Sequence, residues 1–300
     1  MQINHRTARG IEWPTLAMIG ICYASWFAGL FVLANLSLWF TFPFLALAGA
    51  LHSSLTHEAI HGHPFRSAKL NAALVALPLS FCVPYGRFRD QHLAHHHDEI
   101  LTDPYDDPES NFLDPAVWAA LPRAAQIALR LNNTLAGRII IGPILGQALF
   151  MLNDLRAIRS GDHAARNAWL IHMPLAALVL IIVLAAPIPI WVWLLSVWLG
   201  LGLLKIRTFL EHRAHERARA RTVVIEDQGP LALLFLNNNF HVVHHMHPHT
   251  PWYRLPALYR ANRAHYLGRN DGYRYASYAE VFRQHFLHAK DPVPHPLFRR

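Results

Sequence analysis

Apolar positions in this chain gather in long runs that contain no charged residue. No Asp, Glu, Lys or Arg occurs from Trp13 to His57 or from Asn167 to Leu204. A bilayer core about 30 Å thick is crossed by about 20 helical residues, so each run has room for two crossings and a tight turn. Globular proteins rarely have two such runs. The pattern therefore predicts membrane spans at about 14–34, 38–58, 168–186 and 189–208.

The charges that flank these runs predict their orientation. Arg6 and Arg9 precede the first run, and the two breaks, near Ala34–Leu38 and Ala185–Ile190, carry no charge. Because Lys and Arg concentrate in cytoplasmic segments, both chain ends and all charged segments are expected in the cytoplasm. The first run is far longer than the roughly 7–15 apolar residues of a signal peptide, so we interpret it as an uncleaved span.

The predicted fold class is therefore an all-α integral membrane protein with four transmembrane helices in two hairpins and a histidine-rich cytoplasmic cap. We expect one domain over residues 1–300. Leu70–Tyr85 is uncharged but short and contains two prolines, so it is expected to be an interfacial or re-entrant segment. Ile139–Asn153 is an apolar stretch of similarly limited length. The tail from Pro251 onward has nine Lys or Arg against three Asp or Glu and is expected on the cytoplasmic surface.

The composition agrees with this picture and narrows the partners. Apolar residues make up 53% of the chain and charged residues 15%, below the usual quarter of soluble proteins. A net charge of +8 fits contact with anionic lipid or an acidic protein, and no nucleic-acid-binding motif is present, so no nucleic-acid partner is expected. Cys22 and Cys82 both lie in apolar segments, so neither a disulfide framework nor a thiolate metal site is expected.

Histidines carry the candidate chemistry, because the 22 in the chain include four clusters. His57 and His61 stand four residues apart and share one face of a helix. Residues 92–96 and 241–245 both read HxxHH, a pattern expected only about 0.1 times by chance at this composition. A fourth cluster, residues 211–216, follows the last predicted span. The predicted topology brings all four clusters to the cytoplasmic side.

The number of histidines suggests more than one metal ion. A tetrahedral zinc takes four ligands, whereas two irons with five or six ligands each have use for nine. A redox-active pair beside apolar spans also suits O2 chemistry on a lipid chain. The candidate ligands are His57, His61, His92, His95, His96, His241, His244, His245 and one residue of the fourth cluster, either His212 or His215.

Two other functions compete with this interpretation. His57-Glu58-Ala59-Ile60-His61 matches the HExxH motif of zinc proteases, in which Glu58 is the general base, and its position suits an intramembrane protease. That hypothesis leaves both HxxHH motifs unexplained and has no obvious third ligand. A metal transporter is the other alternative, but transport favours polar groups at mid-span, where only His172 lies. Metal content distinguishes the three functions.

The boxes HxxxH, HxxHH and a late HxxHH on a two-hairpin membrane frame resemble those of the membrane fatty-acid desaturase superfamily, over roughly Trp13 to Pro256. The segment 244–252, HHMHPHTPW, also resembles the late box of bacterial desaturases and carotenoid ketolases. The resemblance implies two non-haem Fe ions in a cytoplasmic cap, O2 as co-substrate, a lipid-like acyl substrate and a bacterial inner membrane. The absence of a haem-binding HPGG motif implies a separate electron donor such as a ferredoxin.

The resemblance leaves the reaction open. Desaturation is expected because it is the commonest activity of the superfamily. Hydroxylation or ketolation, and oxidative decarboxylation of a fatty acid to a terminal alkene, remain alternatives on the same centre.

The ninth ligand is expected to be His212 rather than His215. Acyl-CoA desaturases of the superfamily have NxxxH here, and Thr208 stands in the place of the Asn. If the fourth span continues as a helix, Thr208 and His212 share a face, while His215 lies one turn further on.

The other histidines are expected to have lesser roles. Those near the boxes are expected behind the ligands or on the surface, namely His52, His63, His97, His247 and His249. A further set is expected in solvent, namely His163, His265, His285, His288 and His295. Carboxylates near the boxes are candidates to accept the far N–H of ligand imidazoles, namely Asp90, Asp98, Asp103, Asp106, Asp107 and Glu211. Trp252 and Tyr253 are expected in an aromatic belt at the membrane interface.

Overall fold

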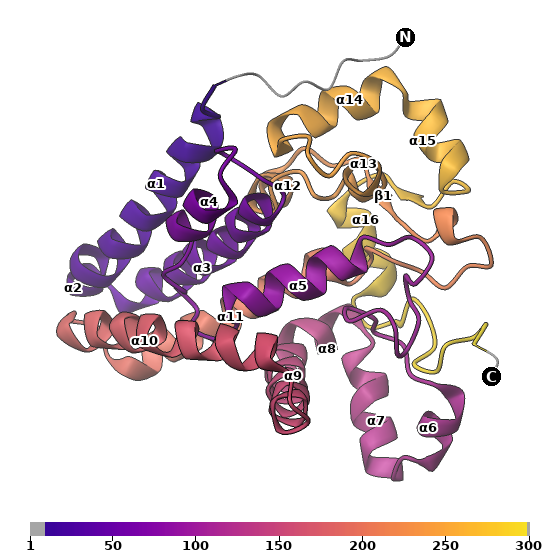
Figure 1. The fold of residues 1–300 in the computed structure, drawn as a ribbon, viewed down its shortest axis with the longest axis horizontal. Coiled ribbons are helices and arrows are strands. Elements are labelled where there is room, and N and C mark those ends of the chain that lie inside the picture. The colour runs from indigo at the N-terminus through magenta and orange to yellow at the C-terminus, as the bar shows by residue number, and fades with distance from the viewer. Residues whose placement is uncertain (1–9, 299–300) are drawn as a thin grey trace.

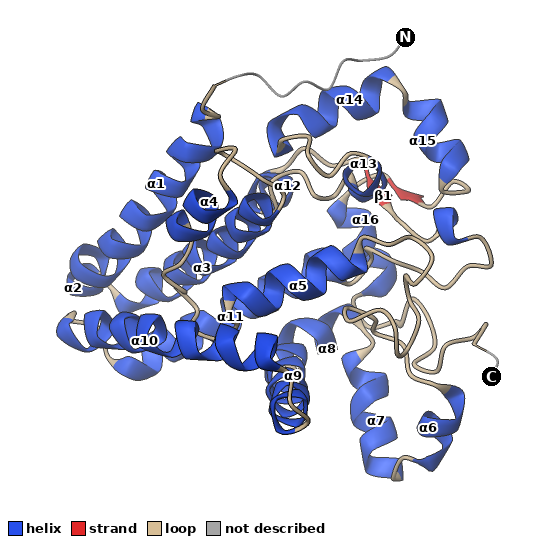
Figure 2. Cartoon of the chain, in the orientation of Figure 1, coloured by secondary structure: helices blue, strands red, loops and turns tan. Residues whose placement is uncertain are grey.

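The computed structural model describes residues 10–298 and consists mostly of helices (Figure 2). The first uncharged run forms α1 (Trp13–Ala28), a π-helical turn (Gly29–Leu33), α2 (Ala34–Leu36) and α3 (Leu38–Ile60). The second forms α10 (His163–Ala185) and α11 (Ile190–Thr208). The segments long and apolar enough to cross a membrane are Trp13–Leu36, Leu38–Ile60, His163–Ala185 and Ile190–Thr208. The prediction of four such helices is confirmed, at nearly the expected bounds.

The breaks between the paired helices have identifiable causes. Ser37 is extended, with φ −164° and ψ 118°, and it ends α2 and precedes α3. The break between α10 and α11 contains Pro187 and Pro189, which lack the amide hydrogen that a continuing helix needs. Each uncharged run therefore folds as two helices joined by a short turn.

Close backbone contact joins the two helix pairs. A Cβ added to Gly200 of α11 would lie 2.9 Å from the carbonyl oxygen of Ala46 in α3, so only glycine permits this approach. Trp26 of α1 and Trp193 of α11 belong to one buried cluster with Leu45 of α3. The frame that carries the histidines is therefore a packed unit of α1, α3 and α11.

Shorter elements complete the chain. Between the pairs lie α4 (Ala68–Leu74), α5 (Tyr85–His95), α6 (Pro115–Ala120), α7 (Arg123–Asn132), α8 (Leu135–Ile140) and α9 (Gly142–Arg159). After α11 come η2 (Ala218–Ala220), α12 (Pro230–Leu234), α13 (His241–Met246), η3 (Trp252–Arg254), α14 (Leu255–Ala261), α15 (Arg263–Arg269) and α16 (Tyr278–His285). Strands β1 (Val224–Ile225) and β2 (Arg274–Tyr275) pair in parallel. Figure 1 shows α1, α3 and α10 on one side, α14–α16 on the other, and α5 between them.

Leu70–Tyr85 contains part of α4, an irregular segment whose Val75 and Leu79 are buried in the protein, and the first residue of α5. It is not among the helices able to span a membrane in the described part of the chain. Ile139–Asn153 forms the end of α8 and most of α9.

The last fifty residues are partly packed into the protein, because His295 is buried and Nζ of Lys290 donates to the carbonyl oxygen of His212. One expectation about them was wrong. Trp252 does not belong to an exposed belt. Its side chain is buried in the core cluster of α1 and α3, because its backbone N–H donates to the buried carboxylate of Glu58 and draws the turn inward.

The sequence suggested that the fourth long helix continues to His212, but the helix ends earlier. It ends at Thr208, and His212 forms an antiparallel bridge with Thr222. The N–H of Arg213 donates to the carbonyl of Arg221, and the N–H of Val223 donates to that of Glu211. These hydrogen bonds between the segments 211–213 and 221–223 replace the helical ones, so Thr208 and His212 do not share a helical face.

Candidate metal centre

Nine histidines converge from four separate segments. His57 lies in the last turn of α3, and His61 is its C-cap residue. In α5 the HxxHH motif places His92 and His95 inside the helix and His96 at its C-cap. The second HxxHH motif lies within α13, and His212 comes from the loop after α11. All nine are the residues expected from the sequence if His212 is chosen over His215.

The nine form two adjoining groups, each with ligand atoms within 4.8 Å of one another. The first, which we call the five-histidine group, contains His57, His61, His92, His96 and His244. The second, the four-histidine group, contains His95, His212, His241 and His245. The rings of His96 and His245 stack with centroids 4.4 Å apart, so the two groups adjoin directly.

The spacing of the ring nitrogens fits metal ions. In the five-histidine group, Nε2 of His92 lies 2.9 Å from Nε2 of His61 and 3.0 Å from that of His96. In the four-histidine group, Nε2 of His212 lies 2.8 Å from Nε2 of His95 and 3.0 Å from that of His241. Imidazole nitrogens bind transition-metal ions at about 2.1 Å, so two nitrogens at right angles on one ion lie about 3 Å apart.

Buried nitrogens without partners point to the same conclusion. Nε2 of His57 and Nε2 of His245 are buried and have no hydrogen-bond partner. Buried polar atoms are normally satisfied, so each such atom needs an explanation. A bound ion would supply the missing partner, and the residues therefore fit two metal ions.

The electrostatic environment keeps most of these imidazoles neutral, which is the form that binds metal. Burial, followed by the neighbouring histidines, lowers the pKa of His61, His96, His212, His241 and His244 below the usual value of 6.5. Burial also lowers the pKa of His245, to about 4. His95 differs: burial opposes its charge, but Glu109 and Asp107 raise its pKa to about 9.

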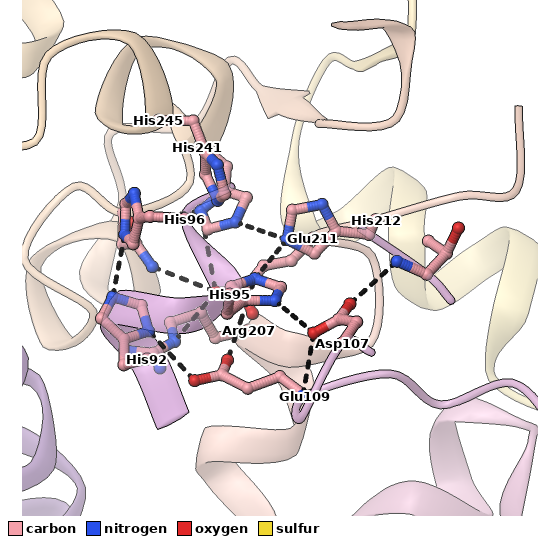
Figure 3. A network of polar contacts seen from close by, with 12 residues as sticks. His92, His95, His96, Asp107, Glu109, Arg207, Glu211, His212, His241 and His245 are labelled. Atoms are coloured by element: carbon pink, nitrogen blue, oxygen red, sulfur yellow. Dashed lines mark hydrogen bonds and ion pairs between the residues drawn. The ribbon is translucent and has the colours of Figure 1, made fainter. Parts of the chain in front are cut away.

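Carboxylates after α5 hold the far side of its histidines (Figure 3). Nδ1 of His95 lies 2.8 Å from Oδ1 of Asp107, and Nδ1 of His92 lies 3.0 Å from Oε1 of Glu109. Such contacts leave Nε2 as the nitrogen directed at the other histidines. Asp107 was expected in this role. Glu109 was not, although the acidic run 106–109 was a signal for it.

The histidines of α13 have their own partners. Nδ1 of His241 lies 3.3 Å from Oδ1 of Asn238 and 3.9 Å from Oε1 of Glu211, while Nδ1 of His245 lies 3.6 Å from Oδ1 of Asp98. Arg207 pairs with Glu211 one turn away. Asp98 therefore faces the far nitrogen of His245, as expected, whereas Glu211 accepts from Nδ2 of Asn238 and does not accept the His241 N–H itself.

The remaining expected carboxylates have other contacts. Asp90 pairs with Arg89, and Asp103 accepts hydrogen bonds from the N–H groups of Tyr105 and Asp106. No contact between a histidine and Asp90, Asp103 or Asp106 was found in the described residues. Asp90 lies within α5 beside Arg89, and the Asp103 side chain is bonded to the backbone of its own turn.

Most of the other histidines lie outside the two groups, as expected. His63 is buried against Glu12, His52 lies 3.3 Å from the hydroxyl of Tyr23, and Nδ1 of His249 donates to the carbonyl of His61. His97 is exposed, and His247 is half-buried. His163, His265 and His288 are exposed. His285 is half-buried beside Tyr275, and His295 is buried against Thr102, so the solvent expectation was wrong for these two.

His215 lies apart from both groups. Its Nδ1 accepts a hydrogen bond from the N–H of Arg217, and its Nε2 lies 3.7 Å from Oδ2 of Asp271. The chain turns away after the bridge at His212, which directs His215 toward the surface.

Glu58 does not face the histidine nitrogens as a protease base would. Its Oε2 accepts the N–H of Trp252, and its Oε1 lies 3.8 Å from Nδ1 of His57, on the side away from the unpartnered Nε2. The zinc-protease hypothesis gains no support from this geometry. His172, the mid-span histidine of the transporter hypothesis, lies 2.9 Å from the carbonyl oxygen of Phe81 and is satisfied.

An apolar pocket lies between α1, α3 and α11. Two of these helices lead to the histidines, because α3 has His57 in its last turn and α11 is followed by the loop of His212. The lining residues are Trp26, Leu45, Gly49, Leu79, Ser80, Trp193, Ser196, Val197, Gly200, Leu201 and Leu204.

The fold and the site define a helical protein with four potential membrane spans and two adjoining histidine groups able to hold metal ions. The chain belongs to the fatty acid desaturase family, because the model of the family described as "Fatty acid desaturase" matches residues 33–277. It is also similar to the beta-carotene ketolase of Paracoccus sp. (strain N81106 / MBIC 01143), with 28% identity over 264 residues that cover 81% of this chain and 91% of the relative. The resemblance inferred from the histidine boxes is confirmed, and both matches support a lipid-modifying oxygenase.

Proposed function

We propose that the protein is an O2-dependent di-iron oxidoreductase of the membrane that introduces a double bond into a fatty-acyl or similar lipid chain. The observation that carries this proposal is the convergence of nine histidines into groups of five and four. Nine imidazole ligands suit two iron ions, whereas one tetrahedral zinc takes four ligands. When bound, the irons would supply O2 activation and the removal of hydrogen from an unactivated C–H bond.

The protein's own residues have three tasks in this reaction. The nine imidazoles hold the metal ions, with Glu109 and Asp107 fixing the orientation of His92 and His95. The apolar pocket beside α3 and α11 would line the approach of the hydrocarbon chain to the centre. Desaturation converts one CH2–CH2 unit, one O2, two electrons and two protons into one CH=CH unit and two waters. The electrons come from a separate donor such as a ferredoxin.

We place the four long helices in a bacterial inner membrane, with the histidine groups on the cytoplasmic side. The uncharged turns at 34–38 and 185–190 support this orientation, because the positive charges then lie on the inner side.

Ketolation or hydroxylation is a second candidate, and the similarity to a beta-carotene ketolase favours it. Lipid extracts of cells with and without the gene, grown under 18O2, distinguish the reactions by mass spectrometry. Desaturation gives a product lighter by two hydrogens without 18O, whereas ketolation or hydroxylation gives a product that contains 18O. A terminal alkene one carbon shorter than its fatty acid would indicate decarboxylation. Lipids that do not change, from a protein that binds zinc and no iron, would contradict the proposal.

A further inference from the structure

The segment Phe286–His295, which we call the C-terminal strap, contacts several of the segments that surround the metal centre. The N–H of Ala136 donates to the carbonyl of Phe286 over 2.9 Å, and Nδ2 of Asn133 donates to that of Asp291 over 2.6 Å. The N–H of Leu113 donates to the carbonyl of Val293 over 3.0 Å. Figure 1 shows this yellow segment beside the loop that follows α5. The strap is thus held by the end of that loop and by the junction of α7 and α8.

Lys290 of the strap reaches the loop of His212. Its Nζ donates to the carbonyl oxygen of His212 over 2.6 Å and lies 5.6 Å from the ring centroid of Tyr273. The hydroxyl of Tyr273 donates to the carbonyl of Leu210 over 2.7 Å, and the guanidinium of Arg213 lies 4.6 Å from the same ring. Because α11 ends at Thr208, these contacts and the bridge to Thr222 hold His212 in place of helical bonds.

His295 of the strap reaches a second ligand through a chain of hydrogen bonds. Its Nδ1 accepts the N–H of Leu297, so its Nε2 donates to the hydroxyl of Thr102 over 3.1 Å. The N–H of Thr102 donates to Oδ2 of Asp107 over 2.8 Å, and Oδ1 of Asp107 accepts from Nδ1 of His95 over 2.8 Å. The strap therefore supports the carboxylate that orients His95.

Both supported ligands belong to the four-histidine group. Nε2 of His95 and Nε2 of His212 lie 2.8 Å apart there. Within residues 10–298 we find no hydrogen bond from the strap to the five-histidine group, which comes from α3, α5 and α13. His95 and His212 are separated by 117 positions in sequence, so their alignment depends on tertiary contacts of this kind.

We propose that the C-terminal strap positions the four-histidine group and affects its metal affinity more strongly than that of the five-histidine group, which the strap reaches only at one further step, through Glu109. The inference rests on the proposed function, in which each group holds one iron. Lys290 and His295 are positioning residues that act through His212 and Asp107 and do not touch the metal.

The test uses the full chain, purified in detergent and loaded with 57Fe. Lys290→Met and His295→Leu each remove one hydrogen-bond donor. Lys69→Met and His288→Leu are matched controls at exposed positions, the second within the strap itself. Iron per chain is measured against increasing chelator, and Mössbauer spectra report the two positions separately. Mutation of a residue that supports a metal ligand by a hydrogen bond typically costs about 10- to 100-fold in metal affinity. In both strap variants we expect one iron to be lost at a lower chelator concentration than the other, and one of the two Mössbauer signals to change. Lys290→Arg should restore part of the lost iron.

Hydrogen–deuterium exchange of the metal-free protein gives a readout that needs no iron. In Lys290→Met we expect faster exchange at residues 209–213, with residues 57–61 unchanged. Equal loss of both irons, or two unchanged irons with unchanged exchange, would overturn the inference. A wild-type protein that never binds two irons would instead contradict the proposed function, and the exchange experiment would still test the strap.

Discussion

Oε1 of Glu109 lies 3.0 Å from Nδ1 of His92, and its other oxygen lies 3.9 Å from Nε2 of His95, a nitrogen of the neighbouring group. One carboxylate therefore contacts histidines of both groups. It comes from a loop seventeen residues after His92, whereas the histidines themselves lie on α5. The orientation of the second histidine box thus depends on the loop that follows it.

The first prediction concerns this carboxylate. Glu109→Gln keeps the shape of the side chain but weakens acceptance of the His92 N–H, because a charged acceptor makes the stronger bond. We expect iron affinity to fall about 10- to 100-fold. Chelator titration of purified protein measures it, with Glu99→Gln, at an exposed position of the same loop, as the control. An unchanged titration curve for Glu109→Gln would show that the contact has no part in metal binding.

The second prediction separates the two candidates for the ninth ligand. We expect His212→Ala to lose about one iron per chain, because Nε2 of His212 lies between those of His95 and His241. We expect His215→Ala to keep both irons, since that side chain contacts Arg217 and Asp271 near the surface. Elemental analysis of the two purified variants makes the comparison. Iron loss in His215→Ala with retention in His212→Ala would reverse the assignment.

The third prediction concerns topology. Single cysteines introduced at Leu36 and at Arg89 into a Cys22→Ala, Cys82→Ala background should label from opposite sides of the membrane. Both native cysteines are buried and free, so their replacement removes background labelling. We expect Arg89→Cys to react from the cytoplasmic side and Leu36→Cys from the outer side. If Arg89→Cys reacted from outside, the histidine boxes could not assemble on the cytoplasmic side.

The fourth prediction is the pH dependence of the metal-free protein. A histidine whose pKa is lowered on folding contributes stability that is present above pH 6.5 and is lost as the pH falls toward the folded pKa. For His245 this loss runs from about pH 6.5 to about pH 4, and five further ligands act in the same direction. Thermal midpoints in detergent should therefore fall steadily below pH 6.5.

His95 acts in the opposite direction. Its pKa is raised to about 9, so its contribution is present below pH 6.5 and is lost as the pH rises through 9. Asp107→Asn should therefore reduce the loss of stability on the alkaline side of the profile, with Glu109 still in place, and leave the acid side unchanged. A profile that is flat from pH 4 to pH 7 would show that these imidazoles are not held neutral in the folded protein.

The sequence by itself determined the four long helices and the identity of the clustered histidines. Uncharged runs of this length have few structures open to them, because an apolar helix must be buried in protein or lipid. The HxxHH spacing places its histidines on one face of a helix wherever that helix lies, as in α5 and α13. These are local properties, and local properties can be predicted from neighbouring residues.

Tertiary structure decided how the histidines are shared between two groups and what supports them. His92 and His95 lie in one helix yet join different groups, because their partners come from α3 in one case and from the loop of His212 in the other. The end of α11 at Thr208, the burial of His295 and the contact of Lys290 with His212 likewise depend on segments far apart in the chain. A periodic pattern describes one helix at a time, whereas hydrogen bonds between distant segments form only when the whole chain is folded.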